Sequence, residues 1–301
     1  MTAIAGFHCA DGVVLAADTE ESYGNDKAYG HKLFPVERSD ARLCVAGAGL
    51  GYLIDYANEQ IVSALDSGIT DVNAFYIKLA DILDELYVHG GKFSRFPVSE
   101  PAELRIDLLI GVQFLKDADK SIWTRPALFE CRSNLVTRIL RRKQSCIVGS
   151  GEVLKQLGIQ FAGWGLTTTL AELASINVIH QAKRRYGGVG GKTHIFTMRT
   201  DGTFTYNRGG KSVDREPTME RFERVAQMLM LCLDPSMPDA RVKDLFSNAE
   251  RWMKNERKHL QQIEREGKGK HESIDTGSRD FERLIKRMTT PSVSQKSEPE
   301  Q

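Results

Sequence analysis

Thr2 is the first residue with evident chemical potential, because removal of Met1 would leave a hydroxyl and a free α-amine on one residue. Initiator methionine is trimmed when the next residue is small, so we expect the mature chain to begin at Thr2. A free α-amine has an ordinary pKa of about 8, so some of it is neutral near pH 7 without any histidine. A hydroxyl beside such a base can act as an activated nucleophile.

An acidic and a basic residue follow that could tune this nucleophile. Asp18 ends the small, apolar segment GVVLAAD, and Lys32 lies fourteen residues later in HKLFPV. A buried ammonium beside the α-amine disfavours protonation of that amine and lowers the cost of forming an alkoxide. Taken separately, Asp18 also fits a carboxylate that makes a turn bond, and Lys32 fits a solvated surface lysine.

A glycine and a serine could complete the site. Gly47 lies in CVAGAG, where it would serve either a tight strand-to-helix turn or a bare backbone N–H aimed at an oxyanion. Ser150 lies in VGSGE, where it would either cap a helix or relay protons near the terminal amine. Each of these residues has an ordinary structural interpretation as well as a chemical one.

The elements that would position these residues alternate between two periodicities. Short apolar segments predict strands over residues 2–9, 13–17, 33–36, 43–46, 106–114, 123–129, 135–139, 145–148, 194–198 and 204–206. Three- and four-residue spacing predicts helices over 54–65, 72–86 and about 169–185, with N-caps at Thr70 and Thr169. The stretch 89–104 is rich in Gly, Pro and Ser and predicts a loop.

This order predicts an α+β fold in which two sheets pack together with helices outside, a four-layer αββα sandwich. We expect that domain to span residues 2–210. Residues 211–255 predict a helical extension, with helices over 219–233 and 240–253, and residues 256–301 predict a charged, partly disordered tail. The extension would be either an assembly element or a cap packed on the same subunit.

Composition removes several classes of function. Lysine and arginine number 41 and aspartate and glutamate 40, so the net charge of +1 argues against a nucleic-acid partner. No segment approaches the ~20 apolar residues of a membrane span, and MTAIAGFHCADG lacks the features of a secretory signal. The five cysteines are scattered without metal-ligand spacing, so we expect a cytoplasmic protein with no metal and no cofactor.

The order of these motifs carries more information than any one of them. The chain reads Met-Thr-x-x-x-Gly, then DGVVLAADT, HKLFPV, LCVAGAG and finally VGSG before a helix. This series resembles the β-type subunits of the 20S proteasome and their bacterial relatives, which are N-terminal nucleophile (Ntn) hydrolases. The resemblance covers about residues 2–206 and implies the αββα fold.

The resemblance also implies a role for each matching residue. Thr2 matches the nucleophile and its amine the general base, while Asp18 and Lys32 match the charged pair that tunes it. Gly47 matches the oxyanion donor, and Ser150 the serine of the Gly-Ser-Gly turn. The pocket that reads the residue before the cut bond would be lined by Val45, Gly49 and Glu21.

One segment departs from the family. Its members often carry Asp-x-x-Ser-Gly-Gly before the penultimate strand, whereas this chain has YGGVGG. Tyr186 and Val189 therefore stand where the family has the aspartate and the serine that brace the terminal amine.

The resemblance implies a threonine-type endopeptidase that acts on peptide substrates in a ring-forming homo-oligomer, and it allows an ATP-driven unfoldase as a partner. Two other functions stay open. A non-catalytic structural subunit of such a ring is favoured by Tyr186 and Val189, and an Ntn amidase would act on a small amide.

Overall fold

The computed structural model describes residues 2–23, 26–93, 106–117, 121–139, 145–148, 165–208, 216–232 and 237–267. Its strands form two antiparallel sheets and one separate hairpin. The first sheet has the order β11-β1-β2-β12-β13, with strands β1 Ile4–His8, β2 Gly12–Asp18, β11 Ser145–Val148, β12 Thr193–Arg199 and β13 Phe204–Asn207. The second has the order β10-β9-β7-β6-β5, with strands β5 Leu33–Glu37, β6 Ala41–Gly49, β7 Ile106–Asp117, β9 Ala127–Arg132 and β10 Leu135–Ile139, and β8 Ile122–Trp123 pairs with β7.

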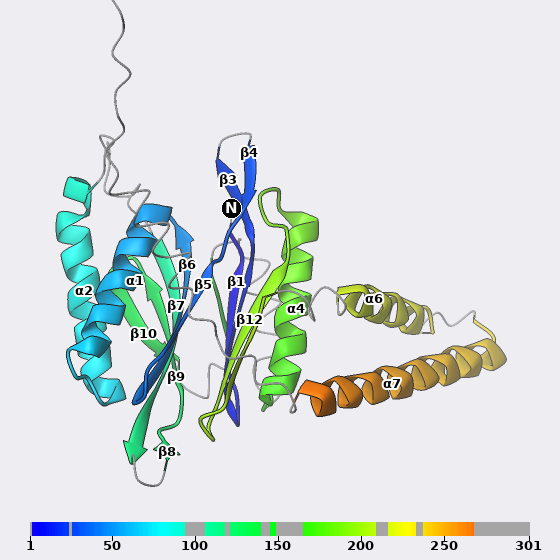
Figure 1. The fold of residues 1–301 in the computed structure, drawn as a ribbon. Coiled ribbons are helices and arrows are strands. Elements are labelled where there is room, and N and C mark those ends of the chain that lie inside the picture. Colours follow the sequence, from blue (N-terminus) through cyan, green and yellow to red (C-terminus); the bar gives the residue numbers. More distant parts are fainter. Residues whose placement is uncertain are drawn as a thin grey trace, which may run out of the picture.

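Five helices accompany the sheets within the described residues: α1 Gly51–Asp66, α2 Val72–Phe93, α4 Thr168–Arg185, α6 Glu216–Leu231 and α7 Asp239–Gly267. The first two lie against the β6–β7 sheet, and α4 covers the outer face of the β1–β2 sheet (Figure 1). The two sheets face each other between them. The predicted mixed α+β class is therefore present, and the paired strands run antiparallel.

Strict alternation along the strands explains how one chain fills three apolar layers. In β2, Val14 and Ala16 pack toward α4, whereas Val13, Leu15 and Ala17 pack toward the other sheet. Successive strand side chains point to opposite faces, so a strand buried on both faces must be apolar throughout. The uninterrupted apolar sequence GVVLAA is the consequence.

Two helix starts differ by one or two residues from the predicted caps. The α2 helix is capped by Asp71, not Thr70: the Asp71 carboxylate accepts the N–H groups of Asn73 and Ala74 at 2.8 and 3.0 Å. The α4 helix is capped by Thr167, not Thr169, and its hydroxyl oxygen accepts the Leu170 N–H. Each actual cap is the small polar residue that directly precedes the first helical turn.

Other boundaries also shift. Helix α2 continues to Phe93, so the first residues of the predicted 89–104 loop are helical. Helix α7 continues to Gly267, so the predicted boundary between residues 255 and 256 falls inside a helix. A further hairpin, β3 Glu20–Tyr23 with β4 Asp26–Tyr29, was not predicted, because its polar residues carry no apolar alternation.

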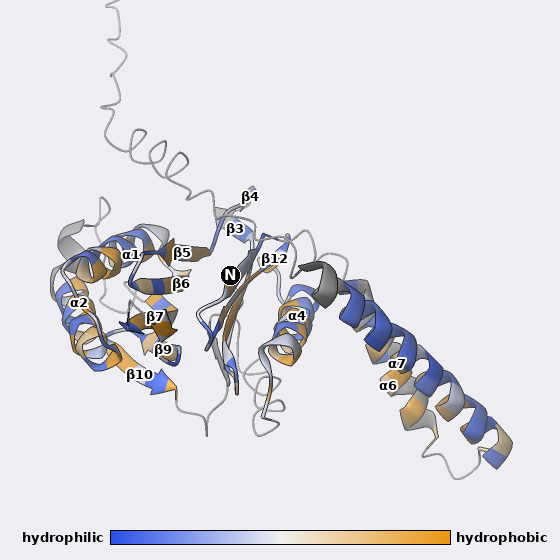
Figure 2. Cartoon of the chain, turned by 60° about the horizontal axis from the view of Figure 1, so that its bottom comes forward, coloured by the Kyte–Doolittle hydropathy of each residue, from blue (hydrophilic) through white to orange (hydrophobic). Residues whose placement is uncertain are grey.

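The two C-terminal helices lie outside the sheet layers. Helix α6 contacts α4, and α7 runs back alongside α6, so that the two helices project together from the body (Figure 1). Most of α7 is hydrophilic (Figure 2). Contact between the two helices includes the aromatic rings of Phe222 and Trp252, whose centroids are 6.3 Å apart.

A histidine is buried close to the end of the β1–β2 sheet. His194 in β12 is 4 % exposed, and its ring stacks on His31 with centroids 5.1 Å apart. The Tyr206 hydroxyl lies 3.5 Å from His194 Nδ1. Burial, together with the charges of His31, Arg208 and Lys192, lowers the pKa of His194 to about 4. The imidazole is therefore neutral in the folded protein at neutral pH.

His194 should make the protein less stable as the pH falls from about 6.5 to about 4. In that window the unfolded chain binds a proton at His194 and the folded chain does not, so the free energy of unfolding decreases by up to roughly 3 kcal/mol. We expect His194→Gln to flatten this part of a urea-unfolding profile measured against pH. His259→Gln, which removes an exposed imidazole on α7, is the control, and equal flattening in both variants would contradict the assignment.

Candidate active site

The Asp18 carboxylate is the centre of the candidate site. It lies at the end of β2, is 0 % exposed, and accepts four hydrogen bonds. Oδ1 accepts the Ala3 N–H and the Lys32 ammonium, both at 2.9 Å. Oδ2 accepts the N–H groups of Glu20 at 3.2 Å and Gly190 at 3.1 Å. Each oxygen is thus fixed by two donors, which holds a charged group where water cannot reach it.

Lys32 lies just before β5 and completes the predicted acid–base pair. Its side chain is 7 % exposed, and its ammonium donates to Asp18 Oδ1 and to the backbone carbonyl of Glu20. Two fixed acceptors and a buried stem leave the ammonium little freedom. The two residues that the sequence separates by fourteen positions are therefore in direct contact.

Thr2 is half-buried and directly precedes the residues that Asp18 binds. The N–H of the Thr2–Ala3 peptide bond donates to Asp18 Oδ1, and the Asp18 N–H donates to the Ala3 carbonyl at 3.2 Å. The same Oδ1 receives the Lys32 ammonium. Peptide bond and ammonium thus share one oxygen, which brings the positive charge close to the backbone of Thr2.

The glycine-rich segment before β12 closes the other side of Asp18. In addition to the Gly190 bond to Asp18, the Lys192 N–H donates to the Thr19 hydroxyl oxygen at 2.8 Å. A Cβ on Gly190 would overlap the Glu20 carboxylate, and one on Gly191, whose φ is +68°, would overlap Thr19. These glycines allow the backbone to approach the site, and they are the sequence signal by which Gly190 could have been recognised.

Glu20 is a further buried charge that the sequence did not reveal. Its side chain is 6 % exposed and forms an ion pair with Lys27 at 2.8 Å. Because its carbonyl binds Lys32 while its N–H binds Asp18, the backbone of Glu20 contacts both members of the buried pair. Nothing in its sequence context distinguishes it from a surface glutamate at the start of a hairpin.

Gly47 is buried in β6, opposite Leu108 of β7. A Cβ at this position would overlap Cγ2 of Ile54 on α1. The close packing of α1 on β6 therefore requires a glycine here whatever chemistry the N–H performs. The oxyanion role of Gly47 stays a prediction.

The three residues expected to line a substrate pocket differ in their surroundings. Val45 is 0 % exposed and belongs to the apolar cluster beneath α1 and α2, so it lies in the core of this chain. Gly49 is exposed, with a φ of +125° at the end of β6. Glu21 is half-buried beside Gly30. The pKa of Asp55 on α1 is raised mainly by burial, then by the charge of Glu59, and least by the charge of Glu21.

The remaining predicted residues do not join this cluster. Ser150 lies outside the described residues. Val189 is 4 % exposed and belongs to the apolar cluster between α4 and its sheet, and the partly buried Tyr186 packs against that cluster. Apolar packing therefore occupies the positions at which the resembled family has an aspartate and a serine.

Three buried cysteines are poor alternative nucleophiles. Burial raises the pKa of the thiols of Cys9, Cys44 and Cys131, so these groups stay protonated and unreactive. Within the residues that the structure describes, no three His, Cys, Asp or Glu side chains are grouped to hold a metal ion. None of the described helices is long and apolar enough to span a membrane.

Comparison with known proteins finds similarity only in three dimensions. No protein-family model matches the sequence, and no curated protein sequence is significantly similar. Among solved structures, Anbu (ancestral beta-subunit) from Yersinia bercovieri has a TM-score of 0.59 and 12% identity, covering 79% of this chain and 99% of that one. The helical assembly of the Anbu complex from Pseudomonas aeruginosa has the same TM-score and coverage, at 15% identity.

A third structure agrees with these two. The Gly-1 mutant of Anbu from Hyphomicrobium sp. strain MC1 has a TM-score of 0.59 and 15% identity, covering 75% of this chain and 96% of that one. At such identities the similarity shows a shared fold. The coverage values show that nearly the whole of each Anbu chain corresponds to part of this one.

The Asp18–Lys32 pair should show strong energetic coupling. Lys32→Met leaves a buried carboxylate without its cation, and we expect a loss of about 3–5 kcal/mol in the free energy of unfolding. Asp18→Asn should cost a similar amount, but the double variant should cost clearly less than the two together. A double-mutant cycle in urea measures this, and additive effects would contradict direct pairing.

The packing role of Gly47 can be tested by the effect of a larger side chain on stability. We expect Gly47→Ala to lower the free energy of unfolding by about 1–3 kcal/mol, because the new methyl group displaces Ile54. Ile54→Ala should restore part of that loss when combined with Gly47→Ala, since it removes the overlapping atoms. Denaturant unfolding of all three variants tests this, and a double variant as unstable as the sum would contradict the contact.

Proposed function

We propose that this chain is a threonine-type endopeptidase of a proteasome-related, self-compartmentalising protease, with the four-layer αββα fold of the Ntn hydrolases. The observation that carries the proposal is the buried Asp18–Lys32 pair on the Thr2–Ala3 peptide bond. The fold shared with Anbu structures supports it independently.

In the proposed reaction, Thr2 Oγ attacks the carbonyl carbon of a peptide bond and the Thr2 α-amine accepts the hydroxyl proton. The oxyanion of the tetrahedral intermediate accepts the Gly47 N–H. When the tetrahedral intermediate collapses, the C–N bond of the substrate breaks. The protonated α-amine of Thr2 gives its proton to the leaving amine, and an ester on Thr2 is left. Water, activated by the same amine, then hydrolyses the ester and frees Thr2.

Lys32 supplies the electrostatic part of this mechanism. Its ammonium is nearly excluded from water, so its field at Thr2 is poorly screened. A fixed positive charge disfavours protonation of the nearby α-amine and stabilises negative charge on Oγ. Asp18 accepts a hydrogen bond from that ammonium and so keeps it in place beside the N-terminal strand.

A non-catalytic subunit is the second candidate, and Tyr186 and Val189 are the specific observation in its favour. In that case the Asp18–Lys32 pair would serve only to anchor the N-terminal strand. Self-association is proposed for either role, because one of the Anbu structures is a helical assembly. Peptide substrates and an ATP-driven unfoldase belong to the endopeptidase proposal alone.

The test is covalent labelling with a peptide epoxyketone, a reagent that requires a free α-amine and the adjacent hydroxyl. We expect the intact mass to show loss of Met1 and one adduct per chain. Thr2→Ala should be trimmed in the same way and form no adduct.

Thr203→Ala is the control, since it removes a threonine hydroxyl from the exposed turn between β12 and β13, where that hydroxyl donates to Asp201 at 2.7 Å, and it should still be labelled. A trimmed wild-type chain that forms no adduct would overturn the endopeptidase proposal and favour the structural subunit.

A further inference from the structure

Helix α6 contacts the body through a partly buried charged group at its first residue. Glu216 Oε1 accepts the Lys183 ammonium of α4 at 2.5 Å and the Thr193 hydroxyl of β12 at 2.9 Å. The Lys183 ammonium also donates to the Thr193 hydroxyl oxygen at 3.0 Å. Lys183 and Glu216 side chains are 12% and 22% exposed, and Thr193 is fully buried. One carboxylate thus binds together a helix of the body, a strand and the extension.

The strand residue in this triad is linked to the candidate active site. Thr193 lies directly opposite Asp18 in the pairing of β12 with β2. The backbone just before it carries two of the contacts already described, the Gly190 N–H on Asp18 and the Lys192 N–H on Thr19. A shift of Thr193 would therefore move donors that hold the Asp18 carboxylate.

Apolar packing reinforces the same connection. Met219, one turn after Glu216, is 8% exposed and belongs to the apolar cluster that includes Val189 and, at its margin, Tyr186. Those two residues stand where the resembled family has its bracing aspartate and serine. In this chain a side chain from the extension joins the cluster at these positions.

We propose that Glu216 is a positioning residue for the candidate active site: its direct contacts with Lys183 and Thr193 hold residues 189–193 in the arrangement that fixes Asp18. This inference rests on the proposed function. It assigns to the extension a part of the bracing that the family's aspartate and serine would give and that the apolar side chain of Val189 cannot give.

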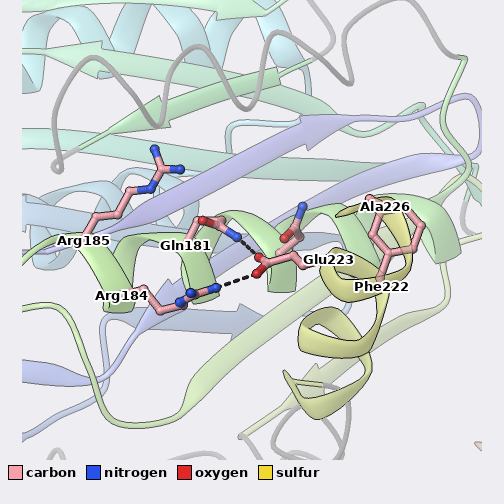
Figure 3. Close-up of a pocket in the computed structure, with 7 residues that line it drawn as sticks. Gln181, Arg184, Arg185, Phe222, Glu223 and Ala226 are labelled. Atoms are coloured by element: carbon pink, nitrogen blue, oxygen red, sulfur yellow. Dashed lines mark hydrogen bonds and ion pairs between the residues drawn. The ribbon is translucent and has the colours of Figure 1, made fainter. Parts of the chain in front are cut away.

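The second acidic contact of the same helix provides a matched control. Glu223 accepts hydrogen bonds from Gln181 and Arg184 of α4 beside an open groove of about 490 Å³ (Figure 3). The Arg184 side chain is 56% exposed, and neither of these partners lies on β12. Loss of Glu223 therefore weakens docking of α6 without touching Thr193.

The experiment compares Glu216→Met with Glu223→Met in the full-length protein by two measurements. Hydrogen exchange followed by mass spectrometry reports on the peptide that covers residues 187–193. The rate of epoxyketone labelling against pH reports on Thr2. Because Glu216→Met leaves the buried Lys183 unpaired and could unfold the chain, the double variant Glu216→Met/Lys183→Met is measured as well.

We expect Glu216→Met and the double variant to exchange about tenfold faster in this peptide and to label at least about tenfold more slowly. The labelling profile should also move to higher pH, since a carboxylate with fewer donors favours the protonated amine of Thr2. Glu223→Met should leave both measurements near wild type.

Each other outcome overturns a defined part of this account. Wild-type labelling by the Glu216 variants, with or without faster exchange, would reduce the Glu216 contact to a structural one and overturn the inference alone. Equal effects in Glu223→Met would attribute the change to docking in general and also overturn it. A wild-type chain that never forms the adduct overturns the proposed function and this inference with it, whatever the exchange data.

Discussion

The rest of the site depends on a single buried carboxylate. Asp18 is fully excluded from solvent, and an isolated charge in that position would cost several kcal/mol. Four donors from four separate segments offset that cost: the N-terminal strand, the Glu20 backbone, Lys32 and the Gly190 backbone. Because all four donors meet at one carboxylate, the hydrogen bonds to Asp18 hold those segments relative to one another. The arrangement around Thr2 is one result of that constraint.

Close approach of backbone segments is the second constraint, and glycine is what permits it. Gly190 and Gly191 let the loop before β12 reach Glu20 and Thr19, and Gly47 lets α1 pack on β6 through Ile54. At Gly47 a packing requirement and a proposed chemical role coincide in one residue. A glycine in a motif therefore does not by itself identify an oxyanion donor, since the same absence of a side chain serves the core.

The C-terminal helices show how a segment outside the sheet layers can contribute to an interior site. Helix α6 adds Glu216 to Lys183 and Thr193 and adds Met219 to the apolar cluster of α4. Helix α7 has a mostly hydrophilic surface, and its apolar contact with α6 includes Trp252 and Phe222. The two helices thus differ in character: one is tied to the body by partly buried charge, and the other is attached through its neighbour.

The sequence by itself determined the order of the apolar strands and of the amphipathic helices, because period-two and period-3.6 patterns follow directly from backbone geometry, whereas the polar β3–β4 hairpin left no such pattern. It also predicted that Asp18 and Lys32 form a pair, because their places in the series of motifs resemble those of a known family's charged pair, and the structure brings the two side chains into contact. It misplaced caps by one or two residues at Thr70 and Thr169, where neighbouring polar side chains compete for the same N–H groups.

Only the tertiary structure decided that Gly190, Glu20 and Glu216 surround the same region, and that Val45 lies in the core. Those contacts join residues up to 172 positions apart, and local patterns carry no information about which distant backbone N–H will meet a buried charge.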